Sequence, residues 1–341
     1  MSSQRYPSDR ERKAVSSVRS RSCTPSESTQ RSSIATPPLT GPAPDQPVGG
    51  ALDYPLLLGD GWRKTVVDHF ERAGLRFDVL DAGGPAAQTV VLLHGFPQQP
   101  SSFNEVTALL HRQGLRTLVP SQRGYTATAR PSRRRDYQTG ETVADVVALL
   151  DAAGLANAHI VGHDWGGVQA WAMGAWHPER VASLTVLSTP HPAALRESLR
   201  VSSQGLKSWY AVMFQLPLLP EAFAARTLGK TLRDTRLPLK YVGRYCDAMA
   251  ERGRLTGALN WYRGIPFSRR PVGAVSVPTT YLWGRHDFAL GRAAAELTEK
   301  HVHAPYEFRE LDSGHWLPEV EPDAVAEAIL DRVAGTGISG S

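Results

Sequence analysis

Short apolar runs alternate with amphipathic stretches from about residue 62 to about residue 335. Apolar runs bounded by turn residues are typical of strands, whereas apolar positions three and four residues apart are typical of helices. A regular alternation of the two predicts a mostly parallel, doubly wound α/β sheet. The strands that we expect are Arg63–Phe70, Leu75–Asp81, Thr89–Leu93, Leu115–Val119, His159–Gly162, Val181–Leu187, Pro278–Trp283 and Tyr306–Leu311.

The expected helices fall between these strands. Ser102 with Glu105 three residues later is a capping-box pattern, and the apolar residues after it predict a helix that begins here. Helical spacing predicts four more helices, at Thr142–Ala153, Val168–Trp176, Gly291–His301 and Pro322–Val333.

Residues 192–272 interrupt the alternation. This stretch is helix-like and rich in Leu, Arg and aromatic residues, and it contains several prolines. Because it lies between two expected core strands, we interpret it as an inserted helical cap over the carboxyl ends of the sheet, where open α/β sheets bind ligands. The predicted core therefore comprises residues 56–191 and 273–335.

Residues 1–55 form a Ser-, Arg- and Pro-rich segment. Such a composition buries too little apolar surface to offset the entropy of ordering, so we expect a disordered, solvated tail or a wrongly assigned start codon. An organelle transit peptide or a polyanion-binding arm is an alternative, although Asp9 and Glu11 disfavour the transit peptide.

Much of the positive charge lies in this tail. The formal net charge is +5, and residues 1–50 hold seven Lys and Arg against four Asp and Glu, a net +3. The other 291 residues carry +2, so we expect no nucleic-acid surface on the folded body.

The chain lacks the patterns of a membrane, secreted or metal-binding protein. No apolar run reaches the length of a membrane span, and the first thirty residues hold no apolar core of a secretory signal. Cys23 and Cys246 lie far apart, so the cysteines supply neither a disulfide framework nor a metal-ligand spacing. We therefore expect a cytoplasmic protein with no metal and no cofactor.

Residues 162–167 read Gly-His-Asp-Trp-Gly-Gly and join an expected strand to an expected helix. A serine between such glycines sits on the strained turn that presents a nucleophile, and Asp164 takes its place here. A serine must lose a proton before it attacks, whereas a carboxylate is already ionised. Attack on an sp3 carbon with a strained or good leaving group gives an ester, which predicts alkyl transfer followed by hydrolysis. On these six residues alone, Asp164 as a helix N-cap stays open.

Two later residues fit the hydrolysis of such an ester. His315 follows the last expected strand, in the position of a base that takes a proton from water. Asp287 follows the strand ending at Trp283 and would hold the His315 ring in one tautomer. A capping histidine and a turn aspartate are the alternatives. Asp312 also competes for the role of the carboxylate that orients the ring. It lies three residues before His315 on the same loop, so it is badly placed to accept a hydrogen bond from the ring.

The segment His94-Gly95-Phe96-Pro97 follows the expected strand Thr89–Leu93. A loop at this point supplies a backbone N–H to an oxyanion hole, so we expect the N–H groups of Phe96 and Trp165 to form one. Phe96-Pro97 is a candidate cis peptide, and His94 itself is interpreted as structural.

Together these motifs resemble the α/β-hydrolase-fold epoxide hydrolases over about residues 60–335. The resemblance rests on His94–Pro97, Arg123–Tyr125, Gly162–Gly167, Asp287 and Gly314–Trp316, and in the cap on Asn260–Arg263 and on Trp209-Tyr210 before Phe214.

This resemblance implies an α/β-hydrolase fold and conversion of a hydrophobic epoxide to a vicinal diol through an ester on Asp164. It also implies that Tyr210 and Tyr262 hydrogen-bond the epoxide oxygen and protonate the alkoxide. Without the resemblance, each tyrosine would be interpreted as an amphipathic core residue of the cap. Departures at Gln98, Gln99, Gln122 and Thr126 leave the catalytic residues intact but weaken any inference about the substrate.

Three other functions compete with this one. A haloalkane or haloacid dehalogenase shares the Asp nucleophile and the His–acid pair, and Trp165 could bind the halide. However, Phe96 occupies the position where Asn often supplies a second donor, and the two tyrosines favour an epoxide. A non-catalytic binding protein of this fold is disfavoured because nucleophile, acid and base are all present. An ester or lactone hydrolase is disfavoured by Asp164.

Overall fold

A computed structural model describes residues 66–84, 88–202, 204–207, 209–217 and 219–336, so the predicted tail lies outside the described residues. Eight strands form one sheet in the order β1-β2-β4-β3-β5-β6-β7-β8. Strands β1 and β2 join at one edge in antiparallel fashion, and β4 to β8 run parallel with β3. The strands are β1 His69–Arg72, β2 Leu75–Ala82, β3 Thr89–Leu93, β4 Arg116–Pro120, β5 Ala158–His163, β6 Val181–Leu187, β7 Thr279–Gly284 and β8 Tyr306–Leu311.

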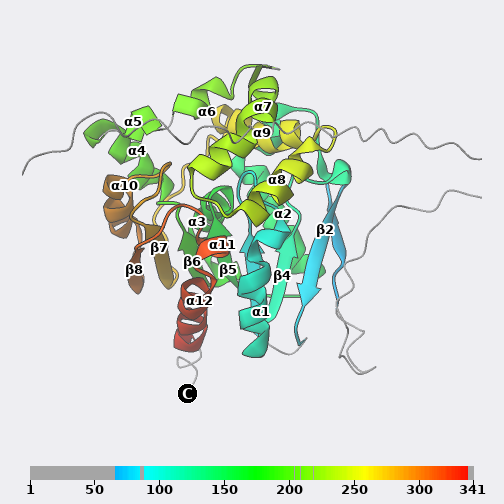
Figure 1. The fold of residues 1–341 in the computed structure, drawn as a ribbon. Helices are drawn as coiled ribbons and strands as arrows, with labels where there is room; N and C mark the ends of the chain where they lie inside the picture. The colour runs from blue at the N-terminus through cyan, green and yellow to red at the C-terminus, as the bar shows by residue number, and fades with distance from the viewer. Residues whose placement is uncertain (1–65, 85–87, 203, 208, 218, 337–341) are drawn as a thin grey trace, which may run out of the picture.

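Helices cover both faces of this sheet (Figure 1). Helices α1 and α12 pack on one face, and α2 and α3 pack on the other. This arrangement confirms the predicted α/β fold. The helices are α1 Asn104–Arg112, α2 Thr139–Ala152, α3 Trp165–Trp176, α4 Pro192–Val201, α5 Gln204–Lys207, α6 Trp209–Met213, α7 Leu219–Asp234, α8 Leu239–Ala250, α9 Arg254–Gly264, α10 Arg292–Leu297, α11 Leu317–Val320 and α12 Pro322–Thr336.

The first hairpin differs from the prediction. We expected a strand ending at Phe70 and a four-residue turn, but β1 continues to Arg72. Only Ala73 and Gly74 turn, with φ of 51° and 75°. Positive φ at both central residues is the geometry of a tight two-residue hairpin, which keeps Glu71 and Arg72 paired in the ladder.

The predicted capping box is wrong. Ser102 lies inside a 3-10 turn, Pro100–Phe103, and α1 begins after it at Asn104. The Ser102 hydroxyl is buried without a hydrogen-bond partner among the described residues. The proline at the start of the turn tightens the backbone two residues before the pattern places the cap.

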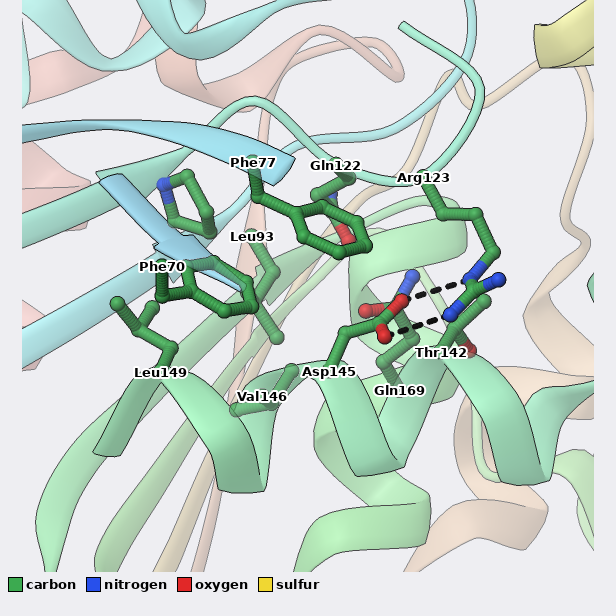
Figure 2. Close-up of a pocket in the computed structure, with 11 residues that line it drawn as sticks. Phe70, Phe77, Leu93, Gln122, Arg123, Thr142, Asp145, Val146, Leu149 and Gln169 are labelled. Atoms are coloured by element: carbon green, nitrogen blue, oxygen red, sulfur yellow. Dashed lines mark hydrogen bonds and ion pairs between the residues drawn. The ribbon is translucent and has the colours of Figure 1, made fainter. Parts of the chain in front are cut away.

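A small cavity lies beside β1, β2 and α2 (Figure 2). Its space of about 10 Å³ is about what one water molecule needs. Arg123 borders it and donates to both carboxylate oxygens of Asp145 at 2.7 Å. The predicted catalytic residues are not among those that line it, so we interpret this cavity as a packing feature around a buried ion pair.

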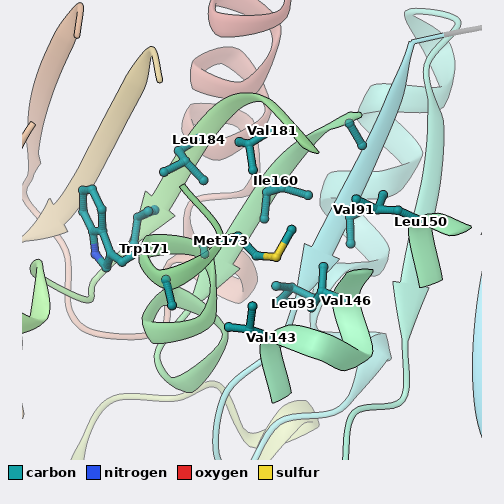
Figure 3. Close-up of a cluster of buried hydrophobic side chains, with 14 of the residues drawn as sticks. Val91, Leu93, Val143, Val146, Leu150, Ile160, Trp171, Met173, Val181 and Leu184 are labelled. Carbon is teal, nitrogen blue, oxygen red and sulfur yellow. The ribbon is translucent and has the colours of Figure 1, made fainter. Parts of the chain in front are cut away.

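The central strands are buried along their whole length, as their continuous apolar runs predict. Between the sheet and helices α2 and α3, side chains such as Val91, Ile160 and Met173 form one cluster (Figure 3). Because β5 is held between β3 and β6 and packed on both faces, its carboxyl end at His163 has a fixed position.

Helices α4 to α9 follow β6 and precede β7, within the predicted cap, residues 192–272. In Figure 1 they lie together at the end of the sheet where β3 and β5 terminate. Buried side chains of α7, α8 and α9 form one aromatic-rich cluster with Tyr125, Tyr137 and Trp316 from outside the insertion. Within the described residues, we find no helix both long and apolar enough to cross a membrane.

Truncation of Ile160 to alanine tests how far the fold depends on β5. Ile160 is fully buried, so Ile160→Ala should lower the free energy of unfolding by roughly 2–5 kcal/mol. Chemical denaturation measures this change. The matched control is Leu80→Ala in β2, where the side chain is 56% exposed and the change should be small. Equal losses in the two variants would contradict the assignment of β5 as the packed centre.

Candidate active site

Asp164 sits at a strained turn between β5 and α3. Its backbone has φ of 51° and ψ of −116°, a conformation that side chains with a Cβ rarely adopt. The turn is possible because Gly162 and Gly166 pack directly against backbone carbonyl groups, where a Cβ would clash. The two glycines thus explain the spacing of the motif, and the strain lifts the Asp164 carboxylate out of the sheet.

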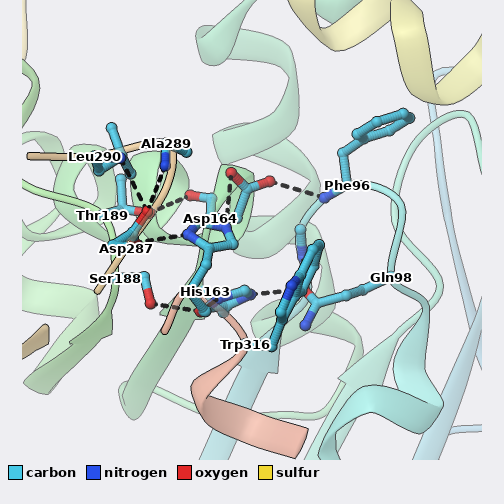
Figure 4. Close-up of polar contacts among 12 residues, drawn as sticks. Phe96, Gln98, His163, Asp164, Ser188, Thr189, Asp287, Ala289, Leu290 and Trp316 are labelled. Atoms are coloured by element: carbon cyan, nitrogen blue, oxygen red, sulfur yellow. Dashed lines mark hydrogen bonds and ion pairs between the residues drawn. The ribbon is translucent and has the colours of Figure 1, made fainter. Parts of the chain in front are cut away.

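The Asp164 carboxylate does not cap α3, so the N-cap interpretation is wrong. Its Oδ1 accepts a hydrogen bond of 2.8 Å from the backbone N–H of Phe96 (Figure 4). Burial raises the pKa of Asp164 above its usual value, and the charge of His315 and the N–H groups of Phe96 and Trp165 offset this rise only in part. The two predicted oxyanion donors therefore meet at this carboxyl group.

Asp287 and His315 lie beside Asp164 in the order that a hydrolytic relay needs. His315 Nδ1 is 2.7 Å from Asp287 Oδ2, and its Nε2 is 3.8 Å from Asp164 Oδ2. Asp287 Oδ1 accepts from the N–H groups of Ala289 and Leu290, which fix the carboxylate. The competing Asp312 is exposed and contacts Arg285 and His286 instead.

The pKa of His315 reflects these two carboxylates. Burial opposes the charged ring, but Asp287 and Asp164 outweigh it and raise the pKa to about 9. With both carboxylates ionised, His315 is protonated at neutral pH. Neutralisation of Asp164, as in an ester, removes one of the two charges, so the pKa falls and the ring becomes available as a base.

Tyr210 on α6 and Tyr262 on α9 lie in the aromatic cluster next to this carboxylate, with their ring centroids 5.9 Å apart. The ring of Tyr262 is 4.9 Å from that of Trp165. Burial, together with the charge of Asp164, raises the pKa of both tyrosines above the usual 10. Both phenols are thus protonated at neutral pH and can donate.

The surroundings of these polar groups are aromatic. The ring centroids of Phe96 and Phe214 lie 5.7 and 4.9 Å from that of Tyr262, and the ring centroid of Phe288 lies 5.3 Å from that of His315. In the part of the chain that the structure describes, no group of three or more His, Cys, Asp or Glu is arranged to hold a metal ion. The chemistry available here is nucleophilic attack by a carboxylate, with proton transfer by phenols and an imidazole.

Sequence analysis missed four buried polar residues behind the site. His163 Nε2 and the Ser188 hydroxyl each lie 2.7 Å from the backbone oxygen of His315. Gln98 contacts both His163 and Glu319. Two of the four, Gln98 and His163, lie in or beside the motifs. The available signal was a polar residue at the end of the apolar strand β5, for His163, and a polar residue directly after the His94–Pro97 motif, for Gln98.

Comparison with known proteins gives three findings. Residues 88–322 match the model of the alpha/beta hydrolase fold family. Epoxide hydrolase 3 of Xenopus tropicalis is 33% identical over 276 residues, which cover 76% of this chain and 75% of that protein. The AB hydrolase superfamily protein YfhM of Bacillus subtilis is 31% identical over 270 residues, 76% of this chain and 94% of that protein. Epoxide Hydrolase A from Mycobacterium thermoresistibile, a crystal structure, superposes with a TM-score of 0.69 at 26% identity, covering 78% of this chain and 97% of that one.

Replacement of Asp164 by asparagine should lower the pKa of His315 from about 9, because one of the two carboxylates that raise it is lost. An NMR titration of the His315 ring measures the shift. The raised pKa of His315 stabilises the folded state fully below pH 6.5, and this contribution is lost as the pH rises through about 9. In Asp164→Asn, the free energy of unfolding should therefore fall less over this pH range. Asp312→Asn, an exposed control, should leave the pKa unchanged; an equal shift in both variants would contradict the assignment.

Proposed function

Because this chain belongs to the α/β-hydrolase-fold epoxide hydrolases, we propose that it converts an epoxide to a vicinal diol through an alkyl ester on Asp164. The observation that carries the proposal is the environment of the Asp164 carboxylate. The backbone N–H of Phe96 holds one of its oxygens, His315 stands beside the other, and the phenols of Tyr210 and Tyr262 lie in the adjacent cluster.

In the first half-reaction, Asp164 attacks an epoxide carbon. Oδ1 stays with the Phe96 N–H, so Oδ2 is the oxygen that forms the new C–O bond. The ring C–O bond breaks, and its electron pair goes to the epoxide oxygen. A tyrosine phenol donates its proton to that oxygen, since an alkoxide is a much stronger base than a phenolate. Two phenols polarise the bond before it breaks.

In the second half-reaction, water hydrolyses the ester. Once the Asp164 charge is lost in the ester, the pKa of His315 falls and the protonated ring releases its proton to solvent. The neutral ring then takes a proton from water, and the hydroxide oxygen attacks the Asp164 carbonyl carbon. Charge then builds on Oδ1, where the N–H groups of Phe96 and Trp165 stabilise it. As the intermediate collapses, the departing diol oxygen takes the proton from His315. The carboxyl proton left on Asp164 restores the phenol, and His315 takes up a proton from solvent once Asp164 is charged again.

A hydrophobic, small-molecule epoxide is the substrate class that the surroundings support. The side chains around the two phenols are aromatic, and an apolar substrate gains free energy by covering them. We also propose a cytoplasmic location, because Cys23 and Cys246 lie far apart in the sequence and supply no disulfide framework.

Single-turnover experiments test the ester directly. His315→Gln should form the ester at a rate near that of the wild type and hydrolyse it very slowly, so a mass increase equal to the substrate should accumulate on the peptide that contains Asp164. In wild-type enzyme turned over once in 18O-water, the label should enter the Asp164 carboxylate. Full and immediate activity of Asp164→Asn would falsify the mechanism. Release of halide from haloalkanes without diol formation from epoxides would support the dehalogenase alternative.

Removal of the phenol hydroxyls tests the proton donors. Tyr210→Phe and Tyr262→Phe should each slow ester formation by about tenfold or more, and the double variant by roughly 100- to 10,000-fold, the range of general acid catalysis. Stopped-flow measurement of the first step gives these rates. Tyr241→Phe is the matched control, because that hydroxyl contacts Glu105 on α1 instead of the candidate active site. A double variant that opens epoxides at the wild-type rate would remove both tyrosines from the mechanism.

A further inference from the structure

A chain of buried polar side chains runs behind the catalytic base. Glu319 on α11 is almost wholly buried, and its Oε1 accepts hydrogen bonds of 2.7 Å from Gln98 and 2.6 Å from the Tyr245 hydroxyl. Gln98 in turn contacts His163, and His163 contacts the backbone of His315. The chain therefore links a carboxyl group to the loop that carries the base.

The orientation of the Gln98 amide follows from one backbone group. The N–H of Gly95 can only donate, and it lies 2.9 Å from Gln98 Oε1, so that atom is the amide oxygen. The amide nitrogen then points to Glu319 and donates to it. Each Gln98 contact thereby has a fixed direction.

His163 then faces an acceptor on each side. Its Nδ1 is 2.7 Å from the Gln98 amide oxygen, and its Nε2 is 2.7 Å from the backbone oxygen of His315. Neither oxygen can donate, so a hydrogen bond on each side needs a proton on both ring nitrogens. A neutral imidazole carries only one, and the cation carries two.

A buried cation needs a counter-charge, and the Glu319 carboxylate can supply it through Gln98. Burial by itself opposes both charges: it lowers the pKa of His163 and raises the pKa of Glu319 to about 7. The titratable groups packed against His163 are His94 and His315, with Asp164 next to it in the chain. The two histidines oppose its charge, which makes the carboxylate the partner that favours it.

We propose that His163 and Glu319 form a buried ion pair bridged by the Gln98 amide, and that this pair positions His315. The bridging Gln98 accepts a hydrogen bond from Gly95, which precedes the oxyanion donor Phe96. His163 precedes the nucleophile Asp164 and contacts the backbone of the base, His315. Glu319 and His163 are positioning residues. The effect on turnover rests on the proposed function, whereas the protonation state of His163 does not.

NMR of protein labelled with 15N-histidine tests the pair. At pH 8, above the pKa of Glu319, both ring nitrogens of His163 should carry protons; His163→Gln and His315→Gln assign the signals. Glu319→Gln keeps an oxygen that accepts from Gln98 and Tyr245 but removes the charge, so His163 should lose one ring proton. A neutral His163 in the wild-type protein, or a cation that persists in Glu319→Gln, would overturn the proposal, and neither result depends on activity with epoxides.

Single-turnover kinetics tests the positioning. Glu319→Gln should slow hydrolysis of the ester by up to roughly 100-fold, the scale of misplacing a reacting group, and leave ester formation nearly unchanged. Glu321→Gln, a partly exposed carboxylate two residues further, is the matched control and should slow neither step. Unchanged hydrolysis in Glu319→Gln, or equal slowing of both steps, would refute the positioning role.

Discussion

The strained turn at Asp164 is the constraint on which the rest of the structure depends. A side chain with a Cβ occupies this backbone conformation only where its surroundings force it to, and here the forcing elements are β5, buried between two parallel strands, and the two close-packed glycines. The strain places the carboxylate against the Phe96 N–H and beside His315. A relaxed turn would place the same side chain at the end of α3 as an ordinary cap.

The protonation state of His315 depends on the charge of Asp164. His315 lies between two carboxylates that together keep its ring charged, and a charged ring cannot take a proton. Ester formation neutralises one of them. In the mechanism that we propose, the first half-reaction creates the base that the second one needs, and water beside a free Asp164 is not activated. This ordering requires no motion of the protein, because it follows from the loss of one charge within a few ångströms of the ring.

Local patterns were sufficient for the sheet, and they pointed to the residues that the structure brings together around Asp164. Strand ends from β2 to β8 fall within one residue of prediction, since continuous apolar runs define buried strands well. The capping box failed because a proline turn competes with it over the same residues. Glu319 could not be found in this way, because its partner Gln98 is 221 residues away and nothing in the sequence next to Glu319 indicates the contact. Contacts of that kind follow from topology, which brings α11 under the loop after β3.

The aromatic cluster around Tyr262 includes side chains from both the inserted helices and the core. Tyr262 packs edge-on against Trp165 and against Phe96, whose backbone N–H groups we assign to the oxyanion. In the proposed mechanism, the aromatic side chains that would contact the substrate therefore also support the residues that would hold the ester during hydrolysis. On this proposal, substrate range and hydrolysis rate are coupled: a smaller side chain at Phe214 would make room for a larger substrate and would also loosen Phe96 and Tyr262, which it contacts. Evolution of a new substrate preference must then proceed by paired changes, one in the insertion and one in the core.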